Sequence, residues 1–192
     1  MTLLLVGLLL FLGSHSIRIF ADGWRGSLVA RLGLQRWKGL HSLVSGAGLV
    51  LVVWGWGLAR PLAVSLWFPP VWTAHLGALL TLLAFVLLAA TYVPGNQIQA
   101  RLHHPMVLGV QLWALAHLLA NGTQLHLLLF GSFLVWALAS FVAALLRDRR
   151  EGRSYPPGRA SRTAIAVLAG AGSWAAFTFW LHERLIGVAP LG

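Results

Sequence analysis

Six long apolar runs, separated by short polar breaks, dominate the sequence. They cover residues 1–17 (or 1–21, if the first helix continues past Arg18), 40–58, 71–93, 106–120, 125–146 and 163–181. Most of them approach the roughly 20 residues that a helix needs to cross the hydrocarbon core of a bilayer. The fourth run spans only if all of 104–121 lies at membrane depth or if the bilayer thins locally. The pattern predicts an all-α, polytopic integral membrane helix bundle with about six transmembrane helices.

The breaks between the runs contain residues that end helices. Pro61, with Pro69 and Pro70, separates the second run from the third, and the turn at 94–96 ends the third. Pro105 stands where we expect the fourth helix to begin, a position that tolerates proline because its missing N–H would have no partner there. Small residues inside the runs predict tight helix contacts. They are Gly46, Gly48, Gly55 and Gly57 in the second run and Gly170 and Gly172 in the sixth.

Positive charge is distributed unequally between the two sets of loops. Of the 14 Lys and Arg residues, only Arg60 and Arg184 fall in one set, and all others fall in alternate loops. Cytoplasmic loops of membrane proteins carry this excess. The loops at 18–38, 94–104 and 147–162 are therefore predicted to be cytoplasmic, with the 121–124 turn and both termini outside. We expect a multi-pass protein of the inner (cytoplasmic) membrane.

Composition supports the membrane assignment and excludes several function classes. The chain is 58% hydrophobic and 9% charged, whereas soluble domains carry about a quarter charged residues. A net charge of +10 would suggest nucleic acid in a soluble protein, but here the charges lie in short loops, so nucleic acid is not an expected partner. The chain has no cysteine, which excludes disulfides, thiolate nucleophiles and covalently attached c-type haem. No repeat or boundary divides it, so residues 1–192 are predicted to form a single domain.

Histidine is the only reactive side chain expected inside the bundle. The four acidic residues, Asp22, Asp148, Glu151 and Glu183, lie in loops or near helix ends, so proton transfer through membrane carboxylates is not indicated. A buried imidazole needs a partner, because an unsatisfied polar group in an apolar environment costs a few kcal/mol. The partner is another polar side chain, a backbone carbonyl or a metal, and the sequence leaves these alternatives open.

The eight histidines differ in their expected depth. His117 is the deepest, roughly 16 Å beyond Met106 along a helix, and His75 lies at a similar depth from the outer side. His15, His41 and His104 lie toward the cytoplasmic side, and His103, His126 and His182 are expected at the interfaces. Two histidines facing each other across the bundle would suit a haem iron. Arg18, Lys38 and Arg101 could then bind its propionates, unless these cations serve topology alone.

Several short stretches carry a resemblance to a known family. The chain resembles the NnrU family of bacterial membrane proteins. The matching stretches are Leu12–Arg18, Arg36–Leu40, Tyr92–Asn96, His104–Met106 and Leu112–Gly122. The resemblance implies a link to denitrification, through the handling of nitrite or nitric oxide, electron transfer or sensing, with a membrane redox partner.

The NnrU family is in turn similar to zeta-carotene isomerase, a membrane enzyme with haem b that isomerises a polyene. The resemblance to the isomerase implies that His15 and His117 are the iron ligands and that His104, next to Pro105, belongs to the cofactor site. The isomerase has a cysteine where this chain has Ala114, so ligand switching through a thiol does not carry over.

Depth leaves a second pairing open. His15 lies only roughly 5 Å inside Arg18 along its helix, which makes His75 and His117 the pair of equal depth. If the Arg18 side chain snorkels to the interface, the first helix continues toward Ala21. The difference in depth between His15 and His117 then becomes smaller.

Three functions follow as hypotheses. The first is a haem b membrane protein that supports denitrification. The second is a haem-dependent cis–trans isomerase of an apolar polyene. The third is a structural membrane subunit without a cofactor, in which the histidines only form hydrogen bonds.

Overall fold

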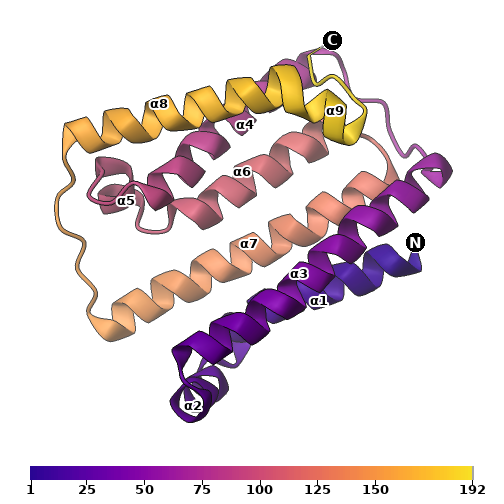
Figure 1. Cartoon of the computed structure of the whole chain (residues 1–192). Coiled ribbons are helices and arrows are strands. Elements are labelled where there is room, and N and C mark those ends of the chain that lie inside the picture. The colour runs from indigo at the N-terminus through magenta and orange to yellow at the C-terminus, as the bar shows by residue number, and fades with distance from the viewer. Residues whose placement is uncertain (192) are drawn as a thin grey trace. The chain divides into compact units, whose positions relative to one another are not determined.

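A computed structural model provides the structure, which describes residues 1–191. The described residues form helices and no strand (Figure 1). In chain order the elements are α1 (Thr2–Phe20), α2 (Asp22–Leu32), α3 (Leu34–Ala59), the 3₁₀ turn η1 (Arg60–Leu62), α4 (Trp72–Tyr92), α5 (Gln97–Leu102), α6 (Pro105–Ala120), α7 (Gln124–Glu151), α8 (Ala160–Ala176), the π-helical turn η2 (Phe177–Leu181) and α9 (His182–Ile186). The predicted all-α fold is confirmed.

Each predicted apolar run corresponds to one helix: α1, α3, α4, α6, α7 and α8. Five segments, Thr2–Phe20, Leu34–Leu62, Trp72–Tyr92, Gln124–Glu151 and Ala160–Ile186, are long and apolar enough to cross a membrane. Helix α6 is shorter, with 16 residues, and begins at Pro105 as predicted. Large apolar side chains in mid-helix positions are exposed, among them Leu9 at 74% and Leu43 at 72%. Lipid is the solvent that suits such surfaces.

Contacts divide the chain into two compact units. The first unit comprises residues 1–66 and 123–132, and the second comprises residues 67–122 and 133–191. Helix α7 begins in the first unit and continues into the second. Each unit is described by itself below, and the single domain expected from the sequence stays a prediction.

In the first unit, α1 and α3 pack as an antiparallel pair at very short range. A Cβ atom on Gly48 would lie 2.6 Å from the backbone nitrogen of Phe11, and one on Gly55 would collide with the backbone of Leu4. From the other side, a Cβ on Gly7 would lie 2.5 Å from the backbone nitrogen of Val52. The contacting positions alternate between three and four residues apart, the spacing of a left-handed helix pair. Glycine permits the close approach.

The predicted glycine contacts are partly right. Gly48, Gly55 and Gly170 meet a neighbouring helix, but nothing lies within 4 Å of a Cβ on Gly46, Gly57 or Gly172. Each of the latter is two residues from a contacting glycine. Positions two apart on a helix do not share a face, so the tight-contact prediction is wrong for Gly46, Gly57 and Gly172.

In the second unit, α4 lies between α6 and α8 (Figure 1). A Cβ on Gly77 of α4 would lie 3.3 Å from the carbonyl oxygen of Ala116 on α6. Similarly, a Cβ on Gly109 of α6 would lie 3.0 Å from the carbonyl oxygen of Ala84. Gly170 of α8 packs against the backbone of Val86. Small residues therefore set the helix spacing in both units.

The polar connections contain structure that the apolar pattern did not predict. Asn96, which is 1% exposed, accepts a hydrogen bond from the backbone nitrogen of Gln99 at 2.8 Å and so caps α5. Its amide nitrogen donates to the carbonyl oxygen of Ala90 at 2.7 Å, which closes the end of α4. The linker before α8 is tied to the same turn, because the nitrogen of Arg159 donates to the carbonyl oxygen of Gly95 at 2.8 Å.

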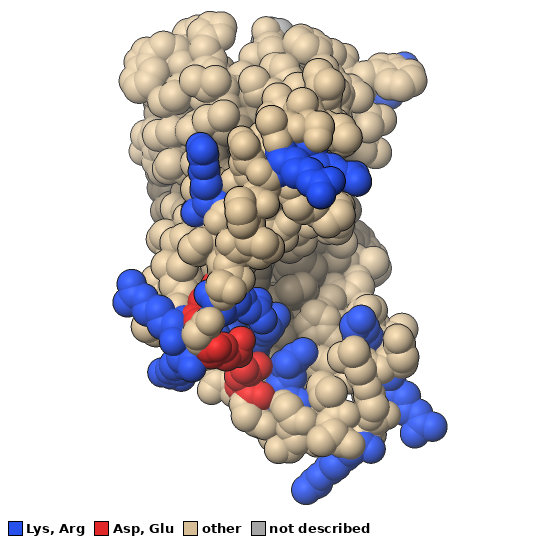
Figure 2. Space-filling model, turned by 90° about the vertical axis from the view of Figure 1, so that its left-hand side faces the viewer, with Lys and Arg blue, Asp and Glu red and all other residues tan. Residues whose placement is uncertain are grey.

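The last turn of α7 is strongly basic. Arg149 and Arg150 lie there, where positive charge interacts favourably with the helix dipole. Figure 2 shows Lys and Arg side chains next to acidic ones on the face that it draws. The acidic residues near this end of α7 are Asp148 and Glu151.

Candidate functional site

The seam between α1 and α3 changes from apolar to polar one turn past the Phe11–Gly48 contact. The hydroxyls of Ser14 and Ser45 lie 3.2 Å apart, and Ser14 also donates to the carbonyl oxygen of Phe11 at 2.8 Å. The hydroxyl of Ser45 lies 3.4 Å from Nδ1 of His41. The polar part of the seam thus begins with two serines and continues into histidine.

His15 is fixed by the turn of α1 that precedes it. Its Nδ1 lies 2.7 Å from the carbonyl oxygen of Phe11, and its ring packs 4.5 Å from the Phe11 ring, centroid to centroid. A carbonyl oxygen can only accept a hydrogen bond, so Nδ1 must carry the proton. The lone pair of the neutral imidazole is therefore on Nε2, the arrangement in which a histidine coordinates a metal through Nε2.

His41 lies against His15 from α3. The two ring centroids are 4.9 Å apart, with the rings edge to face. Rings in this contact leave no space for a porphyrin between them. His15 and His41 therefore do not form a pair of axial ligands as they are placed.

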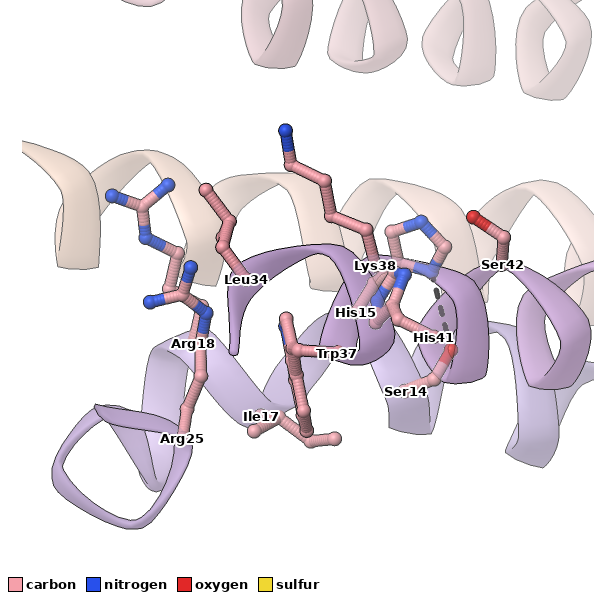
Figure 3. Close-up of a pocket in the computed structure, with 10 residues that line it drawn as sticks. All are labelled: Ser14, His15, Ile17, Arg18, Arg25, Leu34, Trp37, Lys38, His41 and Ser42. Carbon is pink, nitrogen blue, oxygen red and sulfur yellow. Dashed lines mark hydrogen bonds between the residues drawn. The ribbon is translucent and has the colours of Figure 1, made fainter. Parts of the chain in front are cut away.

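A cavity of about 380 Å³ opens beside these histidines, entirely within the first unit (Figure 3). Its volume lies near the lower end of the range for ligand pockets, roughly 300–1,000 Å³. Its lining combines two imidazoles, two hydroxyls, three cations and three apolar side chains. The residues are Ser14, His15, Ile17, Arg18, Arg25, Leu34, Trp37, Lys38, His41 and Ser42.

Helix α2 contributes to this cavity, although the sequence did not predict a helix there. Arg25 of α2 reaches the cavity and forms an ion pair with Asp22 at 3.6 Å. Trp37, which is 9% exposed, closes the cavity from α3 and meets Trp24 of α2 edge to face, with the centroids 6.2 Å apart. The aromatic contact holds α2 against α3, whereas the ion pair lies within α2 and orients the Arg25 side chain.

His117, in the second unit, repeats the local geometry of His15. Its Nδ1 lies 2.8 Å from the carbonyl oxygen of Trp113, four residues earlier. The Trp113 and His117 ring centroids are 5.1 Å apart. By the same argument as for His15, Nδ1 carries the proton and the lone pair is on Nε2. The amide of Asn121 donates to the carbonyl oxygen of His117 at 2.9 Å and holds the end of this helix.

The model of the NnrU protein family matches residues 3–190. The chain belongs to the NnrU family. The match confirms the resemblance seen in the sequence and covers both units. No curated protein and no solved structure matches the chain.

The structure brings together only some of the residues predicted for the cofactor site of this NnrU protein. His15, Arg18 and Lys38 line one cavity of the first unit. Arg101 lies in the second unit, in a separate cavity of about 270 Å³ with Gln97, Ala100, Tyr155, Pro157 and Gly158. The pairing of His15 with His117 joins residues of different units and stays a prediction.

His75 lies in the second unit, like His117, but on another face of α4 than the one that meets α6. Its side chain is exposed, whereas Gly77, two residues further on, packs against Ala116 of α6. Positions two apart on a helix do not share a face. The alternative pairing of His75 with His117 also stays a prediction, and the α4–α6 contact does not support it.

His104 is held by a carboxylate in this NnrU chain. Its Nε2 lies 2.7 Å from Oδ2 of Asp148, and the hydroxyl of Tyr155 donates to the same oxygen at 2.6 Å. Partial burial and the hydrogen bond to Asp148 raise the pKa of Tyr155, so its hydroxyl stays protonated at neutral pH. His104 thus ties the start of α6 to the end of α7, and its predicted cofactor role stays a prediction.

The neighbouring residue, His103, has an unusual backbone. It adopts φ 62° and ψ −49°, and the nitrogen of His104 donates across it to the carbonyl oxygen of Leu102 at 2.7 Å. This is a γ-turn of the rare, strained form. The His103 ring stacks on Tyr155 with the centroids 4.0 Å apart. Nothing in the sequence beyond the His-Pro step indicated this cluster.

The residues of this NnrU chain suit haem better than a bare metal ion. Within residues 1–191, no three His, Cys, Asp or Glu side chains are grouped so that they could hold a metal ion. A haem needs only one or two protein ligands, because the porphyrin supplies the other four. His15 offers Nε2, and Arg18, Arg25 and Lys38 of the same cavity offer positive charge for propionates.

Proposed function

We propose that this NnrU-family protein binds haem b in the membrane, with Nε2 of His15 as an iron ligand. The observation that carries the proposal is the hydrogen bond from Nδ1 of His15 to the carbonyl of Phe11. Metal-bound histidines almost always donate their second N–H to a carbonyl, carboxylate or water, which fixes the ring and its tautomer. A bound haem would supply one-electron redox chemistry or an iron that binds a small gas.

His117 is the second ligand that the family resemblance implies. Its hydrogen bond to the Trp113 carbonyl and the aromatic ring four residues before it repeat the arrangement at His15. This repetition supports an imidazole prepared for coordination on α6. We carry the pair forward as the ligand set to be tested, with His75 as the alternative partner.

The role we propose is support of denitrification in the cytoplasmic membrane, through electron transfer or the sensing of nitric oxide or nitrite. It rests on family membership, together with the bound haem proposed above. The runner-up is a haem-dependent cis–trans isomerase of a polyene. Pigment analysis after gene deletion distinguishes the two, since only the isomerase would leave an unconverted cis polyene.

The absorption spectrum of the purified protein, oxidised and reduced, tests the cofactor directly. We expect a Soret band that is lost in His117→Ala and shifted in His15→Ala, because each variant removes an iron ligand. His126→Ala is the control. It removes an imidazole of the first unit whose Nδ1 lies 2.6 Å from the hydroxyl of Thr123, and we expect it to keep the band.

The outcomes separate the hypotheses. If His15→Ala and His117→Ala keep the wild-type band, the ligand assignment is wrong. If the wild-type protein purified from haem-replete cells shows no Soret band, the haem proposal fails and the protein is a membrane subunit without this cofactor.

A further inference from the structure

Positive charge gathers where α1, α2 and α3 meet. Arg18, Arg25 and Lys38 line the same cavity, one from each helix. Asp22 is the only acidic residue in the first unit, and it pairs with Arg25. The cavity therefore has more positive charge than the carboxylates of its own unit can balance.

Three cations line the cavity, of which Arg18 and Lys38 are exposed and Arg25 is partly buried. Figure 3 shows the guanidinium groups of Arg18 and Arg25 near each other at one end of the group of lining residues, with the Lys38 side chain extending away from α3. The Arg25 side chain is only 29% exposed and is oriented by Asp22 at 3.6 Å. Like charges brought together at one cavity repel each other, and an anion bound among them removes this cost.

Apolar surface lies next to this charge. Trp37, Ile17 and Leu34 line the cavity, and Trp24, which precedes Arg25 on α2, is 56% exposed. Tryptophan concentrates at the level of lipid headgroups. A ligand that fits here has an anionic end and an apolar body.

We propose that Arg18, Arg25 and Lys38 form an anion clamp that holds the carboxylate or phosphate group of an amphiphile in the cavity. The two guanidinium groups match the paired oxygens of either group, and Lys38 adds a point charge. Arg25 makes α2 part of the binding site. The carboxylate version deepens the proposed function, since haem is then the amphiphile, whereas the phosphate version, an anionic lipid headgroup, does not depend on it.

The test compares Arg25→Gln with Arg31→Gln in the full-length protein. Both variants remove one positive charge from α2 and place a good helix former there, but Arg31 is exposed and is not among the residues that line the cavity. Phosphatidylglycerol binding is measured by native mass spectrometry from phosphatidylcholine nanodiscs with and without phosphatidylglycerol. Haem retention is measured with haem and with its dimethyl ester, which lacks the carboxylates.

We expect Arg25→Gln to weaken the binding of phosphatidylglycerol or of haem about tenfold or more, because it removes a charge-assisted hydrogen bond. Arg31→Gln should leave the binding of both ligands near wild type. Weaker phosphatidylglycerol binding identifies a lipid phosphate. Weaker retention of haem, but not of the dimethyl ester, identifies a carboxylate. Lys38→Gln on α3 repeats the measurement without altering α2.

Equal losses in Arg25→Gln and Arg31→Gln would overturn the clamp, because they indicate a general effect of membrane charge. No loss in either variant would also overturn it. If the wild-type protein binds no haem, the proposed function fails, but phosphatidylglycerol binding still decides whether the clamp exists.

Discussion

At the scale of single residues, the two histidines that the family resemblance marks as ligands share one local arrangement. Each lies four residues after an aromatic residue, packs against its ring and donates Nδ1–H to its carbonyl. The spacing of four residues can be read from Phe11 and His15, and from Trp113 and His117. The tautomer cannot, because it depends on which ring nitrogen reaches the carbonyl, and that follows from the side-chain rotamer.

The identity of the partner of His117 can be tested by removing one imidazole at a time. His15→Gly should leave a five-coordinate iron with a high-spin spectrum that binds carbon monoxide more readily. Added imidazole should fill the space and restore the low-spin spectrum. Glycine is the right probe here, since a larger apolar residue would overpack the helix pair.

His75→Gly is the matched variant and should stay low-spin, because His75 lies on another face of α4 than the α6 contact. The opposite result, with His75→Gly high-spin and His15→Gly unchanged, would make His75 the partner. The ligand pattern of the isomerase would then not carry over to this chain.

At the scale of elements, glycine decides how closely α1 and α3 approach. The tight contacts lie at Gly7, Gly48 and Gly55. The cavity begins beyond them, where Ser14 and Ser45 form the contact between the two helices. In lipid the helices have no hydrophobic drive to associate, so close packing must hold them together. The glycines thus keep the pair fixed beside the cavity.

Gly48→Ala should therefore destabilise the protein. Its Cβ would lie 2.6 Å from the backbone nitrogen of Phe11, and backbone cannot yield as a flexible side chain can. We expect the free energy of unfolding to fall by about 1–3 kcal/mol, as for other overpacked sites. Tryptophan fluorescence during titration of detergent micelles with sodium dodecyl sulfate measures it.

Gly46→Ala provides the control on the same helix. A Cβ there meets nothing within 4 Å, and alanine is the better helix former, so stability should be unchanged or slightly higher. If the two variants are destabilised equally, the loss in Gly48→Ala does not come from the α1–α3 contact.

At the scale of the whole molecule, the charge bias of the loops predicts orientation. Arg60 and Arg184 are the only basic residues outside the loops expected in the cytoplasm. The two sides of a membrane differ in this way because positive segments are retained on the cytoplasmic side.

Single cysteines can be introduced for labelling without a native background, since the chain contains none. Ser154→Cys, in the 147–162 loop, should react with a membrane-impermeant maleimide only after the cells are opened. Gln124→Cys, at the start of α7, should react in intact cells whose outer membrane has been permeabilised. Labelling of Ser154→Cys in those intact cells would refute the orientation.

The sequence by itself determined where the helices lie and that they belong in a membrane. In lipid a spanning segment must satisfy its own backbone hydrogen bonds, so a run of apolar residues between Pro, Gly and Asn turns is enough to specify a helix such as α4 or α7. Helices α2 and α5 were not predicted because their sequences carry many polar residues. They depend on contacts such as the Trp24–Trp37 contact for α2 and the Asn96 cap for α5.

Only the tertiary structure decided which faces meet. Hydropathy treats Gly46 and Gly48 alike, but only Gly48 faces α1. It treats Arg18, Arg25 and Arg31 as equal charges, but only Arg18 and Arg25 reach the cavity beside His15. The physical reason is that apolar runs are specified locally, residue by residue, whereas a face is chosen by packing between segments far apart in the chain, here α1 against α3 and α2 over their end.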